Sequence, residues 1–155
     1  MTFRPARLDL VARSLTGAFF CALTLAVLFA VTGPRPMIGL AAAMAGIAAG
    51  CALLVPRAYV IEDGGLTVQR AFGALRVEGP LRVEAVEGRE LQGPRLLGSG
   101  GLFGYQGMYR PPHGKRYAAA LTHRDRAVLV LGSDGGALVS PDDREALLAL
   151  VNPDE

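Results

Sequence analysis

The stretch that decides the fold is SLTGAFFCALTLAVLFAVTGP at residues 14–34, followed closely by MIGLAAAMAGIAAGCALLVP at residues 37–56. Neither segment contains a charged residue, and Arg35 is the only charged residue between them. A helix that crosses a bilayer needs about 20 apolar residues, because each residue adds about 1.5 Å towards a hydrocarbon core about 30 Å thick. The sequence therefore predicts transmembrane helices over residues 15–32 and 37–55, joined by a turn at residues 33–36.

The short turn and the arginines predict how the two helices are oriented. Proline fixes φ and lacks a backbone donor, so Pro34 and Pro36 mark the ends of antiparallel helices that form a hairpin. Positive charge near a span is retained in the cytoplasm. Three arginines precede the first span and Arg57 follows the second, against Arg35 alone in the turn. We expect a basic cytoplasmic N-terminus over residues 1–14 and a multi-pass protein of the cell membrane with both termini in the cytoplasm.

Two alternatives for the first apolar segment fit less well. A cleaved signal peptide would share the basic start, but its apolar region is usually about 7 to 15 residues long, and here a second apolar segment follows at once. A helix lying on the membrane surface would need a charged face, which neither segment has.

Small residues recur every four positions on both apolar segments. They are Ala18, Ala22, Ala26 and Ala30 on the first, and Ala42, Gly46 and Gly50 on the second. Such stripes let backbones approach closely, which drives helix association in lipid. We expect them to close the hairpin on itself. Self-association into a homo-oligomer and a merely alanine-rich composition are the alternatives.

Charge is divided unevenly along the chain. Residues 1–56 carry four arginines and one aspartate, whereas the remainder carries twelve basic and thirteen acidic side chains. Nucleic-acid binding depends largely on neutralising phosphates, so we expect no nucleic-acid partner. The only cysteines, Cys21 and Cys51, lie in the apolar segments, where we expect them to act as small apolar residues.

From Arg57 onwards, short runs alternate apolar and polar residues between glycine-rich breaks, which indicates β-strands. Asp63-Gly64-Gly65 is a hairpin signal, and the runs together predict about seven antiparallel strands. Ser140, followed by Pro141 and two aspartates, predicts the N-cap of a C-terminal helix. The expected fold is a membrane α-helical hairpin plus an α+β or all-β barrel, capped by that helix, over residues 57–152.

Two motifs carry a resemblance to a known family. The runs GGLFGYQGMY at residues 100–109 and VSPDD at residues 139–143 resemble the bacterial PH domain families, and residues 59–68 are similar to the first hairpin of such domains. The chain departs from the family where Arg144 replaces a proline and Leu148 an aromatic residue. The resemblance implies a PH-like barrel, and paired N-terminal spans are common in those relatives.

No pattern predicts catalysis, a metal or a cofactor. The glycines of residues 98–104 miss Gly-x-Gly-x-x-Gly because Phe103 occupies the third glycine position, and no Lys-Ser/Thr follows for a P-loop. His113 and His123 lack the spacing of metal ligands in a domain without cysteine. Asp142 and Asp143 are explained as charges at a helix start. We expect a non-catalytic protein that needs no cofactor.

Candidate contact residues lie on the predicted strands and loops. An open barrel edge could accept a peptide strand, with contacts from Leu102, Phe103, Tyr105 and Tyr109. Basic residues on two neighbouring predicted hairpins could meet anionic headgroups, with scattered solvated side chains as the alternative; they are Arg110, Lys115, Arg116, Arg124 and Arg126. The sequence favours a membrane-anchored interaction module that binds a protein segment or lipid headgroups. The alternative is a small subunit or assembly factor of a larger membrane complex, acting through its helix pair.

Overall fold

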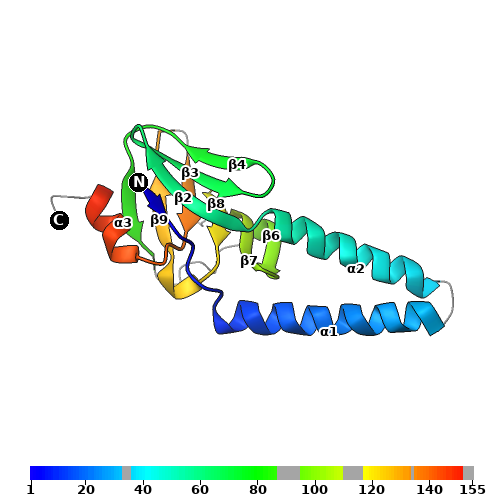
Figure 1. The fold of residues 1–155 in the computed structure, drawn as a ribbon. Helices are drawn as coiled ribbons and strands as arrows, with labels where there is room; N and C mark the ends of the chain where they lie inside the picture. Colours follow the sequence, from blue (N-terminus) through cyan, green and yellow to red (C-terminus); the bar gives the residue numbers. More distant parts are fainter. Residues whose placement is uncertain (33–35, 87–94, 110–116, 134, 152–155) are drawn as a thin grey trace.

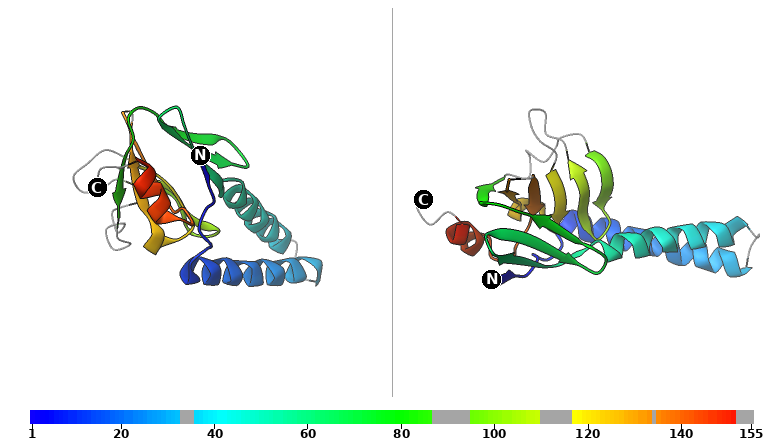
Figure 2. Two further views of the ribbon diagram at one scale, coloured as in Figure 1. Left: turned by 60° about the vertical axis from the view of Figure 1, so that its left-hand side comes forward. Right: turned by 90° about the horizontal axis from the view of Figure 1, so that it is seen from above.

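Two helices project side by side from a β-domain (Figure 1). The computed structural model describes residues 1–32, 36–86, 95–109, 117–133 and 135–151. Helix α1 spans Leu10–Thr32 and helix α2 spans Pro36–Leu53. The two helices converge away from the β-domain and separate where they meet it (Figures 1 and 2). The expectation of an apolar N-terminal helix followed by a β-sheet domain is confirmed.

Helix α1 is long and apolar enough to cross a membrane, whereas the apolar part of α2, Met37–Leu53, is shorter. Helix α1 begins at Leu10 because the Asp9 carboxylate caps it, accepting a hydrogen bond from the Ala12 N–H at 2.7 Å. This start lies five residues before the predicted span at residue 15. The predicted turn at residues 33–36 falls almost entirely outside the described residues.

A four-stranded antiparallel sheet forms one layer of the β-domain. Its strands, in spatial order, are β1 (Thr2–Phe3), β2 (Pro56–Glu62), β3 (Gly65–Arg70) and β4 (Ala74–Val77). The β2–β3 hairpin turns at Asp63 and Gly64, which both have positive φ, as the Asp-Gly signal predicts. Thr2 and Phe3 pair with Val60 and Tyr59. The N-terminus is therefore built into the β-domain.

A six-stranded sheet forms the second layer. Its strands are β5 (Arg82–Ala85), β6 (Arg95–Gly101), β7 (Gly104–Tyr109), β8 (Tyr117–Leu121), β9 (Val128–Leu131) and β10 (Gly136–Val139), in the spatial order β5-β9-β10-β8-β7-β6. Strands β8 and β10 run parallel. The expectation of about seven antiparallel strands is therefore wrong: the described residues form ten strands, and one pair is parallel. The chain crosses over β10 between β8 and β9, which local alternation cannot reveal.

The two sheets pack face to face across the main hydrophobic core. Tyr59, Leu66 and Val68 of the four-stranded sheet contact Val128, Val130 and other residues of the six-stranded sheet. A second cluster on the opposite face of the six-stranded sheet includes Leu129 and Leu138 together with Ala12 of α1. Strand β10 is consequently buried on both faces, which explains its continuous apolar run.

Helix α3 (Arg144–Val151) closes the end of the β-domain that lies away from α1 and α2 (Figure 1). Its cap is Asp143, whose Oδ1 accepts from the Ala146 N–H at 3.0 Å. The expected N-cap at Ser140 is wrong, because Ser140 is buried and its hydroxyl accepts from the Thr122 N–H at 2.8 Å. The N-terminal segment holds the backbone at Ser140 extended, since the Ala6 N–H donates to the Ser140 carbonyl at 2.8 Å.

Candidate functional site

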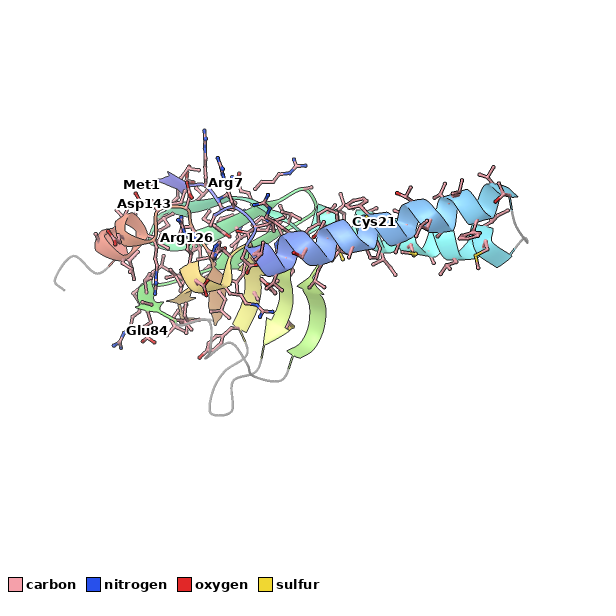
Figure 3. The ribbon with its side chains drawn as sticks, turned by 90° about the horizontal axis from the view of Figure 1, so that it is seen from below. Met1, Arg7, Cys21, Glu84, Arg126 and Asp143 are labelled. Carbon is pink, nitrogen blue, oxygen red and sulfur yellow. The ribbon has the colours of Figure 1, made fainter. Side chains whose placement is uncertain are left out.

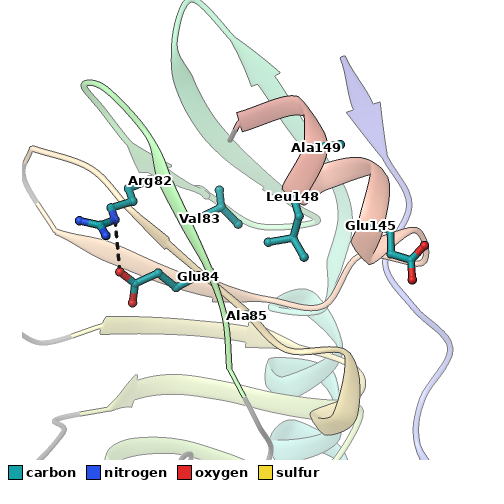
Figure 4. Close-up of a pocket in the computed structure, with 7 residues that line it drawn as sticks. All are labelled: Arg82, Val83, Glu84, Ala85, Glu145, Leu148 and Ala149. Atoms are coloured by element: carbon teal, nitrogen blue, oxygen red, sulfur yellow. Dashed lines mark ion pairs between the residues drawn. The ribbon is translucent and has the colours of Figure 1, made fainter. Parts of the chain in front are cut away.

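An open groove of about 530 Å³ lies between the edge strand β5 and helix α3 (Figure 4). Val83, with 2% of its surface exposed, and the half-buried Leu148 face each other across it. The short side chains of Ala85 and Ala149 leave the groove open on either side. The groove exists because α3 packs against β5, from which it is separated by about 60 residues of sequence. Local patterns therefore could not predict it.

The rim of the groove is charged. Arg82 Nε lies 3.4 Å from Glu84 Oε1 on β5, and both side chains are exposed. Such an exposed pair contributes little to stability, so both residues can change partners at low cost. Glu145, in the first turn of α3, takes part in no ion pair with another described residue. An apolar floor beside a carboxylate suits an apolar segment that carries a basic residue.

The predicted peptide-contact residues are Leu102, Phe103, Tyr105 and Tyr109, and those whose side chains the structure describes differ in their burial. Leu102 and Phe103 form the turn between β6 and β7, and both are half-buried. Tyr105 is only 1% exposed and belongs to the second hydrophobic cluster, so it does not lie on a contact surface. Tyr109 ends β7, and its side chain lies outside the described part of the chain.

Two of the five residues of the predicted basic surface, Arg124 and Arg126, lie in the part of the chain that the structure describes. Arg124 stacks on Tyr105, with its guanidinium carbon 4.0 Å from the ring centroid. Arg126 Nη1 lies 3.1 Å from Asp142 Oδ1 and also donates to the Asp142 carbonyl at 2.7 Å. Both arginines lie in the 3₁₀ helix η2 (Arg124–Arg126) of the β8–β9 crossover, so the hairpin expected there is wrong. The other three basic residues, Arg110, Lys115 and Arg116, lie outside the described residues.

The small-residue stripes do not form the seam of the helix hairpin as expected. Of the first stripe, Ala26 is buried and Ala30 half-buried, whereas Ala18 and Ala22 are exposed. Ala42, Gly46 and Gly50 on α2 are all exposed, and no atom lies within 4 Å of a Cβ built on either glycine. The buried positions of α2 are instead Ala41 and Ala48, which do not belong to the expected stripe.

Two adjacent residues of β7 hold the ends of both helices that meet the β-domain. The Tyr105 hydroxyl donates to Asp9 Oδ1, in the cap of α1, at 3.1 Å. Gln106 points to the other face of the sheet; with its amide nitrogen towards α2, it donates to the Leu54 carbonyl at 3.2 Å and accepts from the Val55 N–H at 3.3 Å. The Arg124 N–H adds a bond to Asp9 Oδ2 at 3.3 Å. Asp9 and Gln106 were missed from the sequence. The signal for Asp9 is an acidic residue directly before an apolar helix, and the signal for Gln106 is a polar residue in the uncharged run of residues 102–109.

Polar groups are also buried between the two sheets. Tyr59 is fully buried, and its hydroxyl donates to the Ala120 carbonyl at 2.8 Å. Burial raises the pKa of Tyr59 to about 12. Burial also lowers the pKa of Arg70, although the nearby Tyr59 partly opposes this shift. The Tyr59 hydroxyl thereby links β2 of one sheet to β8 of the other.

The described residues contain no cluster of three or more His, Cys, Asp or Glu side chains that could hold a metal ion. His123 is half-buried beside η2, and His113 lies outside the described residues. Cys21 and Cys51 are free thiols on the helices. Figure 3 shows Cys21 on the projecting hairpin, whereas the labelled charged residues Glu84, Arg126 and Asp143 all lie on the β-domain.

Comparison with protein-family models, curated proteins and solved structures found no match. The resemblance to the bacterial PH domain families stays a prediction from the sequence motifs at residues 59–68, 100–109 and 139–143.

Proposed function

We propose that this chain is a membrane-anchored, non-catalytic interaction module. The observation that carries the proposal is the surface of α1, where Ala12 and Ala26 are the only buried residues of an apolar 23-residue helix. A helix that is apolar all round is stable either inside a large core or in lipid. Helix α1 projects from the β-domain, packed beside α2 (Figure 1), which leaves lipid as its surroundings.

We propose further that both helices cross the bilayer. Helix α2 has 18 residues, which span about 27 Å at about 1.5 Å per residue, close to the thickness of the hydrocarbon core. The start of α1 and the end of α2 both attach to the β-domain, so a spanning hairpin leaves the whole domain on one side. The arginine distribution assigns that side to the cytoplasm of a cell membrane.

The groove between β5 and α3 is the proposed binding site for a protein segment. It lies at the end of the β-domain away from α1 and α2 (Figure 1), so in a spanning protein it faces away from the bilayer. This position favours a soluble protein segment over a lipid headgroup as the ligand. The chemistry of the groove favours an apolar segment that places a basic residue near Glu145.

A photo-crosslinking residue at the exposed Ala149, in the full chain and in native membranes, tests this binding site. We expect a crosslinked adduct that disappears when Ala85→Arg fills the groove from the opposite wall. The same crosslinker at Ala74, an exposed residue of β4 outside the groove, is the matched control. An adduct that survives Ala85→Arg, or that forms equally at Ala74, would contradict the proposed site.

A second candidate function is supported by the exposed stripe of Ala42, Gly46 and Gly50. Because this stripe faces away from α1, it offers close backbone approach to a helix of another protein or of a second copy. The chain would then be a small subunit or assembly factor acting through its helix pair. Replacing residues 15–55 by an unrelated hairpin distinguishes the two functions: retained partner binding favours the β-domain, and lost binding favours the helices.

The PH-like character of the β-domain is also a proposal. Two packed sheets and a C-terminal helix support it, together with the family-like motifs. The parallel β8–β10 pair departs from an all-antiparallel barrel. Nothing in the proposed binding mode depends on the family, because the groove is defined by residues of this chain alone.

A further inference from the structure

The turn between β6 and β7 docks on α1 inside the apolar part of that helix. The Phe103 N–H donates to Thr16 Oγ1 at 3.0 Å, and the rings of Phe103 and Phe20 meet edge to face with centroids 5.7 Å apart. Gly101 has φ of +126°, a conformation that favours glycine, and a Cβ added there would lie 2.5 Å from Cδ1 of the Leu15 side chain. The turn is thus fitted closely to the helix.

The position of this contact along α1 corresponds to the edge of a bilayer. Arg13 is the last charged residue of α1, and Phe20 lies seven residues beyond it, or about 10 Å along the helix. The headgroup region of each leaflet is roughly 5 to 8 Å thick. With Arg13 among the headgroups, Phe103 therefore reaches the boundary with the acyl chains. Residues 96–109 contain no charged side chain that would oppose this depth.

The backbone at the turn is held in an unusual conformation. Phe103 has φ of 56°, in the left-handed region that residues with side chains rarely adopt. Such strain persists only where the surrounding structure imposes it, often for a functional placement. Here it directs the aromatic ring to Phe20, which is itself exposed.

A second turn, between β3 and β4, makes the corresponding contact with α2. The Phe72 N–H donates to the carbonyl of Leu53, the last residue of α2, at 3.1 Å. The Phe72 side chain is 72% exposed, and the neighbouring Leu53 and Leu54 are 46% and 40% exposed. Large apolar side chains therefore surround the bases of both helices. We call this set the apolar collar: Leu15, Phe20, Leu53, Leu54, Phe72 and Phe103.

We propose that the apolar collar sits in the lipid bilayer at the boundary between headgroups and acyl chains. Exposed apolar residues that are continuous with membrane-spanning helices are stabilised when lipid removes their surface from water. The β-domain is thereby seated on the membrane at a set height through two of its own turns, and not only tethered by its helices. The inference rests on the proposed membrane anchoring and adds the collar as a lipid contact.

Tryptophan fluorescence tests the collar, because the chain contains no tryptophan of its own. Single variants Phe72→Trp and Phe103→Trp of the full chain are reconstituted in vesicles whose lipids carry bromine near the headgroups or near the chain ends. Phe29→Trp, far along α1, reports the anchor itself, and Leu150→Trp, exposed on α3, is the control on the β-domain. We expect both collar tryptophans to show blue-shifted emission and stronger quenching by the shallow bromines than by the deep ones.

The outcomes separate the collar from the anchor. Quenching of the Phe29→Trp variant without quenching of either collar variant would overturn the collar and leave the anchor intact. Blue-shifted collar tryptophans that bromine does not quench would mean that protein covers them, which also overturns the proposal. An unquenched Phe29→Trp variant would contradict the membrane anchoring instead. Phe72→Trp alters an exposed side chain, so its result does not depend on tolerance of the strained turn.

Discussion

At the scale of single residues, Tyr59 joins the two sheets through one buried hydroxyl. It belongs to β2, donates to the Ala120 carbonyl of β8 at 2.8 Å and accepts from the Ser140 N–H, which follows β10, at 3.4 Å. Burial disfavours the charged phenolate, so the pKa of Tyr59 rises from 10.0 to about 12.

The shifted pKa predicts a specific loss of stability in alkali. Between pH 10 and pH 12 the unfolded chain loses the Tyr59 proton while the folded chain keeps it, so the stability present below pH 10 decreases as the pH rises. Tyr59→Phe should cost about 1 kcal/mol at pH 8 through the lost hydrogen bond but show a smaller decrease above pH 10. Urea unfolding in micelles at several pH values measures the free energy of unfolding at pH 8 and its decrease above pH 10. An equally steep decrease in the variant would contradict the assignment.

Gly104 is a residue where backbone conformation and space both exclude a side chain. Its φ is +115°, and an added Cβ would lie 2.5 Å from the Leu121 carbonyl oxygen. We expect Gly104→Ala to reduce the free energy of unfolding by about 3 kcal/mol or more, since strain and a backbone clash combine. Gly64→Ala is the matched control, because Gly64 also has positive φ but open space around it, and should cost about 1 kcal/mol. Equal losses in thermal or urea unfolding would show that the clash is relieved.

At the scale of elements, strand β7 joins the helices to the β-domain. Tyr105 and Gln106 point to opposite faces of the sheet, because successive side chains of a strand alternate. One therefore bonds to the cap of α1 and the other to the end of α2. The adjoining β6–β7 turn adds the contacts of Phe103 with Thr16 and Phe20. A single hairpin thus contacts both helices near the places where they leave the domain.

Among the residues that join α1 to the β-domain, Asp9 is the one whose replacement should lower the free energy of unfolding most. Its carboxylate accepts hydrogen bonds from Ala12, Tyr105 and Arg124. We expect Asp9→Ala to cost about 2 to 4 kcal/mol, because it removes a helix cap and leaves the buried Tyr105 hydroxyl without this acceptor. Asp143→Ala, which removes the exposed single-bond cap of α3, should cost only about 1 kcal/mol. Similar losses for the two variants would mean that Asp9 acts only as a cap.

At the scale of the whole molecule, the hairpin and the β-domain are attached at two places. Residues 1–9 cross the β-domain before α1 begins, with Thr2 and Phe3 in the four-stranded sheet and Ala6 bonded to Ser140. Helix α2 continues almost directly into β2. Two attachments restrict rotation of the domain about the helices, which is the property that a domain seated on a bilayer requires.

Membrane topology is the prediction that belongs to this scale. An alkaline phosphatase fused at Glu155 should be inactive and a fluorescent protein fused there should be bright. Both results are expected if the C-terminus lies in the cytoplasm, as the arginine distribution predicts. The same phosphatase inserted between Gly33 and Pro34 should be active, since the turn would lie across the membrane. Active phosphatase at Glu155 with inactive phosphatase at the turn would reverse the orientation. The same result at both sites, active or inactive, would contradict a hairpin of two spans.

Features that depend on a few neighbouring residues were predicted well. The apolar character of residues 15–32 and the Asp63-Gly64 turn follow from local transfer free energy and local backbone preference. The C-terminal helix was also predicted, although its cap is Asp143 and not Ser140. Ser140 could not be assigned from local preference because the distant residues Ala6 and Thr122 hold it.

The sequence by itself determined that this chain has an apolar N-terminal helix and a glycine-punctuated β-domain, because hydrophobicity and turn preference act within a few residues. Only the tertiary structure decided that β8 and β10 run parallel, that Tyr105 is buried, and that Ala41 and Ala48 form the seam of α2 in place of Ala42. The tertiary structure also forms the groove between β5 and α3 and brings together the residues of the apolar collar. The physical reason is that these features are contacts between segments far apart in the chain, selected by packing and hydrogen bonding over the whole domain.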